Sequence, residues 1–244
     1  MADSSEPIGR DSQFPTTQWS VVARAGVDNG SARAAVAELC REYWYPLYAF
    51  ARRSGATAAE AEDLTQGFFT HFLEDAVYSQ ADPARGRFRT FLLRCFRNYQ
   101  SNHRRADRAK KRGGGAAVVA LDSARADAAY KREPVDPADP ERLYFRRWAL
   151  TVIDDVFVAL GAEFVAAGRG PLFDRLKSSL LGDGDGTYAR IGSDFDMTED
   201  AVKQTASRLR ARFGNILRVH IGALVVRPEE VDDEIRDLMA AVAE

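Results

Sequence analysis

Hydrophobic positions along the chain recur at the spacing of helices. Apolar side chains between residues 31 and about 53 fall at steps of three and four, which predicts a helix with one buried face, bent at Pro46. Thr57 and Glu60 have the spacing of a capping box, which predicts a second helix from there to about Glu74. The inward face of that helix is predicted to carry Ala61, Leu64, Phe68 and Phe72. No strand-like alternation runs longer than a few residues, so the predicted fold class is all-α.

A third helix is predicted within residues 85–112, where apolar and basic positions separate onto two faces. The apolar positions, at helical spacing, are Phe88, Phe91, Leu92, Cys95, Phe96 and Tyr99. The polar positions that fall mainly opposite them are Arg94, Arg97, Asn98, Ser101 and Arg105. The stretch holds eleven Arg or Lys residues and one Asp, a net charge of +10 in a chain whose total is −2, so the remainder carries −12. Because a localised field attracts polyanions, nucleic acid is the first partner to consider.

The chain is predicted to form two helical domains. Residues 113–140 begin with three glycines and contain three prolines but few large apolar side chains, a composition typical of a flexible linker. Residues 1–15 are polar and predicted to be disordered, and a short helix is expected shortly after them. Beyond the linker, apolar periodicity predicts helices over residues 141–167, 172–181 and 198–217 and an amphipathic acidic segment over 228–243.

Residues 187–217 have the pattern of two helices joined by a tight turn, the geometry that offers a helix to the major groove. Thr198 is placed to cap the second helix. Inward positions on the pair are Tyr188, Ile191, Phe195, Val202, Ala206, Leu209 and Phe213. The side chains left facing solvent on the second helix are Lys203, Gln204, Ser207, Arg208 and Arg210. Such side chains can bind bases and phosphates, although paired helices with a charged outer face also occur in all-α proteins that bind no DNA.

Composition and motifs argue against several other classes of function. No apolar run approaches the roughly 20 residues of a membrane span, and no export signal is recognisable, so a cytoplasmic location is expected. Cys40 and Cys95 are predicted to be reduced core thiols, with a disulfide as the alternative. Neither GGG at 113–115 nor GDGDG at 182–186 has the residues of a phosphate loop or a calcium loop. We therefore expect no metal, no cofactor and no catalytic residue, in a protein that is not an enzyme.

Three segments, in this order, resemble parts of sigma-70-type RNA polymerase sigma factors of the small extracytoplasmic-function (ECF) class. AEAEDLTQGFFTHFLE (59–74) is similar to the region 2.2 helix, FRTFLLRCFRNYQSNHRR (88–105) to regions 2.3 and 2.4, and TYARIGSDFDMTEDAVKQTASRLRARF (187–213) to the region 4.2 helix-turn-helix. The resemblance implies two small helical domains joined by a flexible linker. These are a sigma region 2-like domain at 16–112, the linker at 113–140, a sigma region 4-like helix-turn-helix domain at 141–222 and an acidic C-terminal helix at 223–244.

The resemblance also implies partners and site residues. The implied partners are core RNA polymerase, through its clamp helices and flap, and promoter DNA. The positions that match the polymerase-binding face are Glu62, Asp63 and Gln66. The positions implied to contact the −10 element are Arg87, Phe88, Phe91, Arg94, Arg97, Asn98, Ser101 and Arg105. The positions implied to contact the −35 element are Lys203, Gln204, Ser207, Arg208 and Arg210.

Alternatives stay open at several of these positions. Phe91 stands where the family usually has a Trp at the edge of the melted DNA, but a Phe also fits the buried face of its helix. Glu62 and Asp63 could serve only the start of their helix. For the whole chain, the main alternative is a helix-turn-helix transcription regulator that binds DNA and does not engage RNA polymerase. A helical interaction scaffold is a third reading, which leaves the +10 segment unexplained.

The acidic segment from Pro228 carries seven acids and one Arg when Glu244 is counted. We hypothesise that it covers a basic DNA-facing surface or docks a regulator, and completion of the second domain's core is the alternative. The sequence leaves open the promoter sequence and the mode of control, whether by an anti-sigma factor, a regulatory kinase or regulated synthesis.

Overall fold

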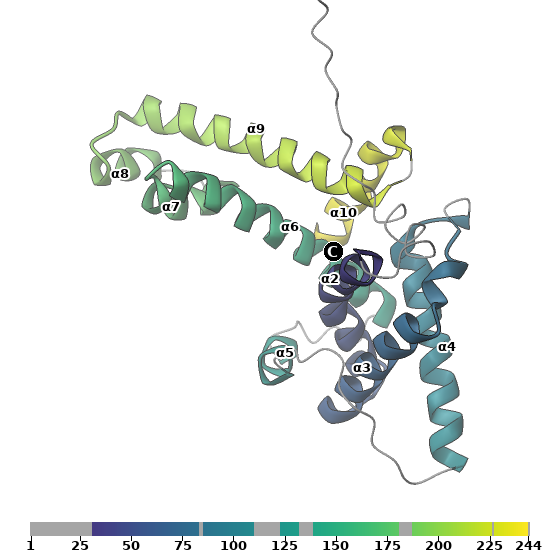
Figure 1. The fold of residues 1–244 in the computed structure, drawn as a ribbon. Coiled ribbons are helices and arrows are strands. Elements are labelled where there is room, and N and C mark those ends of the chain that lie inside the picture. Colours follow the sequence, from purple (N-terminus) through teal and green to yellow (C-terminus); the bar gives the residue numbers. More distant parts are fainter. Residues whose placement is uncertain are drawn as a thin grey trace, which may run out of the picture.

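The computed structural model describes residues 31–82, 85–109, 123–131, 139–180, 187–225 and 227–243. The expected disordered N-terminus and the short helix after it lie outside these residues. The described helices are α2 (Ser31–Arg53), α3 (Ala58–Glu74), η1 (Val77–Gln80), α4 (Phe88–Ala109), α5 (Ser123–Tyr130), α6 (Pro140–Ala166), α7 (Gly170–Leu180), α8 (Thr187–Asp194), α9 (Glu199–Leu224), η3 (Pro228–Glu230) and α10 (Val231–Ala243), shown in Figure 1. Since the described residues contain no strand, the predicted all-α class is confirmed.

Helices α2 to α5 form one end of the molecule, which we call the N-terminal lobe (Figure 1). α3 begins with the predicted capping box, in which Thr57 Oγ1 accepts the backbone N–H of Glu60 at 3.3 Å and the Glu60 carboxylate accepts that of Thr57 at 2.8 Å. Phe68 on α3 is fully buried, and its ring centroid lies 5.2 Å from that of Phe96 and 5.8 Å from that of Tyr99, both on α4. Edge-to-face contacts of this kind hold α4 against α3.

The long helix α6 packs against helices of both lobes. Its first half packs against α2, where Tyr144 and Trp148 are buried and Tyr144 Oη donates a hydrogen bond to the carbonyl oxygen of Arg89 at 3.0 Å. Its second half runs beside α9 and, with α7 and α8, forms what we call the C-terminal lobe (Figure 1). There Phe157 on α6 lies 5.1 Å from Phe213 on α9, between ring centroids. Helix α6, which was predicted as the first helix of the second domain, therefore also packs against the N-terminal lobe.

Helix α5 was not predicted, since it forms inside the stretch interpreted as linker. Asp127 on α5 accepts a hydrogen bond from Tyr48 Oη at 3.3 Å and pairs with Arg52, both on α2. The Arg52 guanidinium also lies 4.6 Å from the centre of the Tyr130 ring. Because α5 is held mainly by charge and by one aromatic ring, it has no long apolar face that periodicity could reveal.

The last helices differ from prediction in length rather than in kind. α9 continues to Leu224 instead of ending near Leu217, because the buried side chains of Ile221 and Leu224 extend its inner face. The acidic segment forms η3 and α10 as expected. α10 packs against α6 and α9 at the junction between the two lobes (Figure 1).

Candidate nucleic-acid interface

Helix α4 presents a polar face whose opposite face is anchored in the core of the N-terminal lobe. Gly86, with a φ of +121°, makes the turn that leads into this helix, a conformation that favours glycine. Leu92 and Phe96 are buried against the lobe. The exposed side chains on the polar face are Arg94, Asn98, Ser101 and Arg105, as the spacing predicted. A donor-rich surface on a rigid helix is suited to contacts with phosphates and bases.

The two phenylalanines expected at the −10 element are covered. Phe88 is 3% exposed and packs edge-on against Tyr43, with ring centroids 5.7 Å apart. Phe91 is 9% exposed, and the Arg94 guanidinium lies 5.8 Å from its ring centre on the outer side. In this arrangement neither ring can stack on a base. Phe91 thus occupies the buried position that was the alternative prediction for it. Arg94, rather than the ring beneath it, faces solvent.

A cleft of about 460 Å³ lies between α4 and the start of α6. Side chains of α4 that line it are Arg97, Gln100, Ser101, Arg104 and Arg105. Arg97 pairs with Glu141 on α6, and Arg104 donates to the carbonyl oxygen of Ser54 at 3.2 Å. The arrangement brings Arg97, Ser101 and Arg105 together at one opening, while part of the charge of Arg97 is already neutralised.

The three residues expected to bind polymerase lie on one side of α3. Asp63 is exposed, and Glu62 and Gln66 are partly exposed. Gln66 Nε2 donates to Glu62 Oε1 at 3.1 Å, one helical turn away. The inward positions expected on this helix, Ala61, Leu64, Phe68 and Phe72, are all buried. The polar side of α3 is therefore a small acidic surface.

In the C-terminal lobe, α8 and α9 are joined by the short connection 195–198. The Thr198 hydroxyl accepts the backbone N–H of Ala201 at 3.2 Å, which caps α9 as predicted. Gly192 is required at the crossing, because a β-carbon there would lie 2.5 Å from the carbonyl oxygen of Met197. The inner positions Ile191, Val202, Ala206 and Leu209 are buried, while Tyr188, Phe195 and Phe213 are partly buried against the same core.

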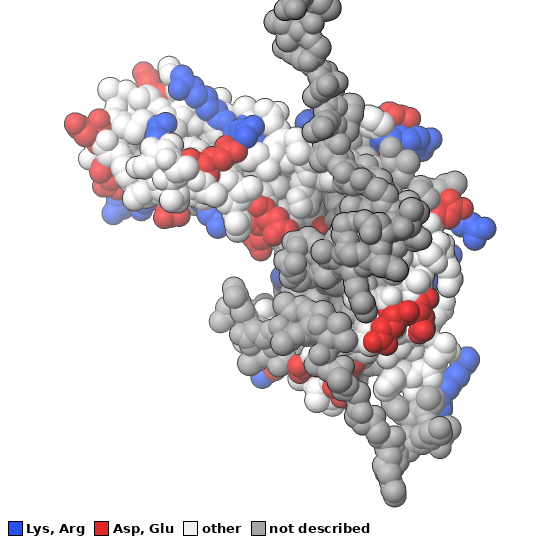
Figure 2. Space-filling view, viewed as in Figure 1, with Lys and Arg blue, Asp and Glu red and all other residues white. Residues whose placement is uncertain are grey.

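The outer positions of α9 are all exposed, and they are Lys203, Gln204, Ser207, Arg208 and Arg210. Two of their cations have partners close in sequence or in space. Lys203 Nζ lies 2.7 Å from Glu199 Oε1, and this hydrogen bond raises the pKa of Lys203. Arg210 donates to Tyr188 Oη at 2.8 Å. In the view of Figure 2, basic side chains lie over α9 and over the far end of α4, with acidic ones interspersed.

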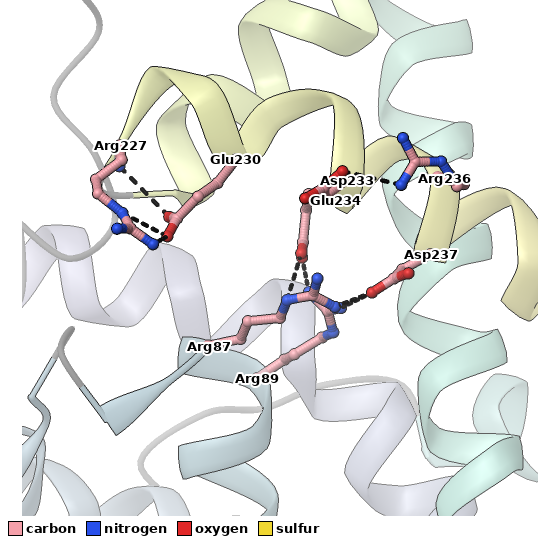
Figure 3. Close-up of polar contacts among 8 residues, drawn as sticks. All are labelled: Arg87, Arg89, Arg227, Glu230, Asp233, Glu234, Arg236 and Asp237. Atoms are coloured by element: carbon pink, nitrogen blue, oxygen red, sulfur yellow. Dashed lines mark hydrogen bonds and ion pairs between the residues drawn. The ribbon is translucent and has the colours of Figure 1, made fainter.

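Arg87, expected at the −10 element, is instead engaged by α10 (Figure 3). Its Nε lies 2.8 Å from Glu234 Oε2, and Nη1 pairs with the Asp237 carboxylate. Arg89 Nη1 also pairs with Glu234, and its guanidinium lies 4.3 Å from the centre of the Trp148 ring. Burial, and next the charge of Arg87, lower the pKa of Arg89 to about 10, so it remains charged at neutral pH.

Arg89, Glu234 and Asp237 are not among the site residues that the sequence predicted. A signal for Glu234 exists, because it falls one turn from Val231 and Leu238 on the apolar side of α10, where a carboxylate needs a cation. Glu234 is 3% exposed and Arg89 is 6% exposed. Nothing in the spacing indicates that the required cation comes from the start of α4.

In the described parts of the chain, no group of three or more His, Cys, Asp and Glu side chains could hold a metal ion. Among the helices of the same residues, none combines the length and apolar character needed to span a bilayer. Cys95 is a free thiol whose pKa is raised by burial.

The structure is that of a helical protein in which α4 on one lobe and α9 on the other each present a polar face to solvent. Residues 39–110, which run from within α2 through α4, match the model of the family described as sigma-70 region 2. No curated protein and no solved structure matches the chain. The family match thus covers most of the N-terminal lobe, and it indicates a part in transcription initiation for this portion of the chain.

Proposed function

We propose that the chain is a sigma factor of the ECF type, which binds core RNA polymerase and directs promoter recognition and melting. The single observation that carries the proposal is the coincidence of the sigma-70 region 2 match with the N-terminal lobe and its exposed basic helix. Under this proposal the protein is a cytoplasmic, non-enzymatic factor that uses no metal or cofactor. Residues 16–112 would be the region 2-like domain and 141–222 the region 4-like helix-turn-helix domain.

Promoter melting is assigned to the α4 face. A surface favours melted DNA when it binds a single strand more tightly than a duplex, through phosphate contacts and base stacking. The donors on this face are Arg94, Arg97, Asn98, Ser101 and Arg105. Phosphate attraction supplies the larger share of the binding energy while Phe88 and Phe91 stay covered. A stacked base contributes roughly 1–3 kcal/mol, so exposure of even one ring on the complex would add a useful contact.

The other two surfaces follow from the same proposal. The polar side of α3, with Glu62, Asp63 and Gln66, is assigned to the clamp helices of the polymerase. The outer face of α9, with Lys203, Gln204, Ser207, Arg208 and Arg210, is assigned to the −35 element, where Gln and Arg can pair with base edges. An anti-sigma factor or a regulatory kinase is the class of regulator that such a factor would meet.

The test is reconstitution with bacterial core RNA polymerase, followed by gel filtration and by transcription from a library of genomic fragments. Co-elution with specific transcripts is the expected result, and aligned start sites would supply the −35 and −10 sequences together. The Asp63→Lys variant should lose co-elution, while Asp154→Lys, a charge change of the same size at an exposed position of α6, should keep it.

The exposed outer face of α9 favours one second candidate, a helix-turn-helix regulator that binds DNA without polymerase. The reconstitution separates the two functions. Specific DNA binding by the free protein, together with no association with core polymerase, would replace the sigma factor with the regulator.

A further inference from the structure

Helix α10 places a row of carboxylates against the entry to α4, the segment that the proposed function gives to DNA. Glu234 and Asp237, one helical turn apart, both point toward Arg87 and Arg89 (Figure 3). The two partners are about 150 residues apart in the chain, so the contact exists only in the folded arrangement. A second pair, Arg218 with Asp232, joins α9 to the start of α10.

The contact has a buried half and an exposed half. Glu234 and Arg89 have side chains that are 4% and 7% exposed, and Arg89 also lies over Trp148. Arg87 and Asp237 are 41% and 49% exposed, so solvent and salt reach this pair. Buried Glu234 positions α10 and also holds Arg87 through Nε, whereas the exposed pair of Arg87 Nη1 with Asp237 can be exchanged for another acceptor without opening a core.

The interface around these residues is not filled. A cleft of about 280 Å³ separates the start of α4 from η3 and α10, and its walls include Gly86, Arg87, Trp148, Arg227 and Asp233. α10 is fastened to the rest of the molecule on its other side, where Leu238 is fully buried and the helix packs on α6 and α9. Ion pairs beside this cleft, one of them buried, therefore join α10 to the start of α4, rather than close apolar packing.

We infer that α10 is an intramolecular competitor of DNA, which holds Arg87 through Asp237 and so withholds the entry of α4 from a nucleic-acid strand. The inference rests on the proposed function, because it concerns the regulation of that same surface. A phosphodiester offers Arg87 the same paired acceptor oxygens as a carboxylate, so one occupant excludes the other. By linkage, DNA that binds Arg87 weakens the contact of α10 with the start of α4, and loss of that contact raises the affinity for DNA.

The experiment measures binding of a fluorescein-labelled, random-sequence single-stranded 24-mer to the full chain by anisotropy, at low and at physiological salt. Asp237→Asn removes one charge, including its 4.0 Å contact with Arg89, and leaves the pairs of Glu234 with Arg87 and Arg89 in place. Its control is Asp233→Asn, which removes the same charge from the same helix, where Asp233 pairs with Arg236 at 2.9 Å. Asp237→Asn is expected to tighten binding about two- to fivefold beyond the control, the range for releasing an exposed ion pair.

Two further measurements make the result specific to Arg87. In an Arg87→Gln background, Asp237→Asn should give no gain over Asp233→Asn, because the released cation is absent. In the wild-type chain, addition of the 24-mer should increase amide hydrogen exchange in α10 and leave exchange in α7 unchanged.

Equal affinities for the Asp237→Asn and Asp233→Asn variants, with α10 exchange unchanged by DNA, would overturn the competition. The proposed function would then still stand if the chain directs transcription with core polymerase. Failure of every variant to bind DNA, both alone and with core polymerase, would instead overturn the proposed function and the regulation with it.

Discussion

The basic side chains of α4 and those of α9 are held in different ways. On α9, Lys203 pairs with Glu199 in its own helix and Arg212 pairs with the exposed Glu163 on α6. At the start of α4, Arg87 and Arg89 are held by carboxylates of α10, one of them buried. Exposed pairs contribute little and exchange readily with phosphate, whereas a buried carboxylate fixes its partner. The basic side chains of α9 are thus available to DNA as they stand. On α4, only the outer positions beyond Arg87 and Arg89 are available in this way.

The largest expected effect comes from removing the support beneath α4. Phe68→Ala should lower the free energy of unfolding by about 3–5 kcal/mol, because the fully buried ring contacts Phe96 and Tyr99 on α4. Chemical denaturation followed by circular dichroism checks this change. Val158→Ala, at a position that is 72% exposed, is the control and should stay within about 0.5 kcal/mol of wild type. Similar losses in both variants would show that Phe68 does not organise the lobe.

A smaller effect is expected from disturbing the support of α9. Gly192→Ala would bring a β-carbon to 2.5 Å from the Met197 carbonyl oxygen, and the strain should cost about 1–3 kcal/mol. Gly214→Ala is the matched control, because a β-carbon there meets nothing within 4 Å beyond its own stretch of helix, and better helix propensity should stabilise it by up to about 1 kcal/mol. Thermal unfolding of both variants tests the pair. Equal and unshifted midpoints would contradict the close crossing of α8 and α9.

The two surfaces can next be compared through the salt dependence of DNA affinity. Arg105→Ala on α4 and Arg208→Ala on α9 should each reduce the slope of log affinity against log salt by about 1, since each removes one phosphate contact. Arg236→Ala on α10, whose side chain pairs with Asp233, should leave the slope unchanged. A slope altered by only one of the first two variants would show that a single surface meets the DNA.

The smallest expected effect concerns the junction of α9 with α2. Burial opposes protonation of His220, but Glu42, with Oε1 at 3.7 Å from Nε2, and the charge of Asp155 favour it more, so the pKa of His220 is raised. A folded-state pKa above the unfolded value of about 6.5 gives stability that is complete below pH 6.5 and is lost as pH rises through the folded-state pKa. Unfolding free energies measured from pH 5.5 to 8.5 should therefore fall more steeply for wild type than for His220→Asn. Identical pH profiles would remove this role.

Much of the fold could be predicted from local pattern. The capping box at Thr57 and the inner faces of α3 and α9 appear in the structure where the spacing predicted them. The polar positions Arg94, Asn98, Ser101 and Arg105 are exposed on α4 for the same reason. Periodicity succeeds here because a helix has only one face to bury, and three- and four-residue spacing identifies that face without knowledge of the partner.

The candidate site was less predictable. Spacing placed Phe88 on an inner face, and resemblance assigned the same residue to DNA, but only the structure shows its ring packed against Tyr43. The helix α5 carries no long apolar stripe, and its contacts with Arg52 come from a neighbour about 75 residues away. Such contacts depend on which helices meet, which a local pattern does not contain.

The sequence by itself determined the all-α class, the helix faces and the concentration of positive charge at residues 85–112, because these depend on neighbours within one or two turns. The tertiary structure decided which of those charges remain free. Glu234 and Asp237 lie far along the chain from Arg87 and Arg89, and only the packing of α10 on α6 and α9 brings them together. Electrostatic energy depends on distance in space, so the sequence determines where the charges lie along the helices, and the tertiary fold determines which of them form ion pairs.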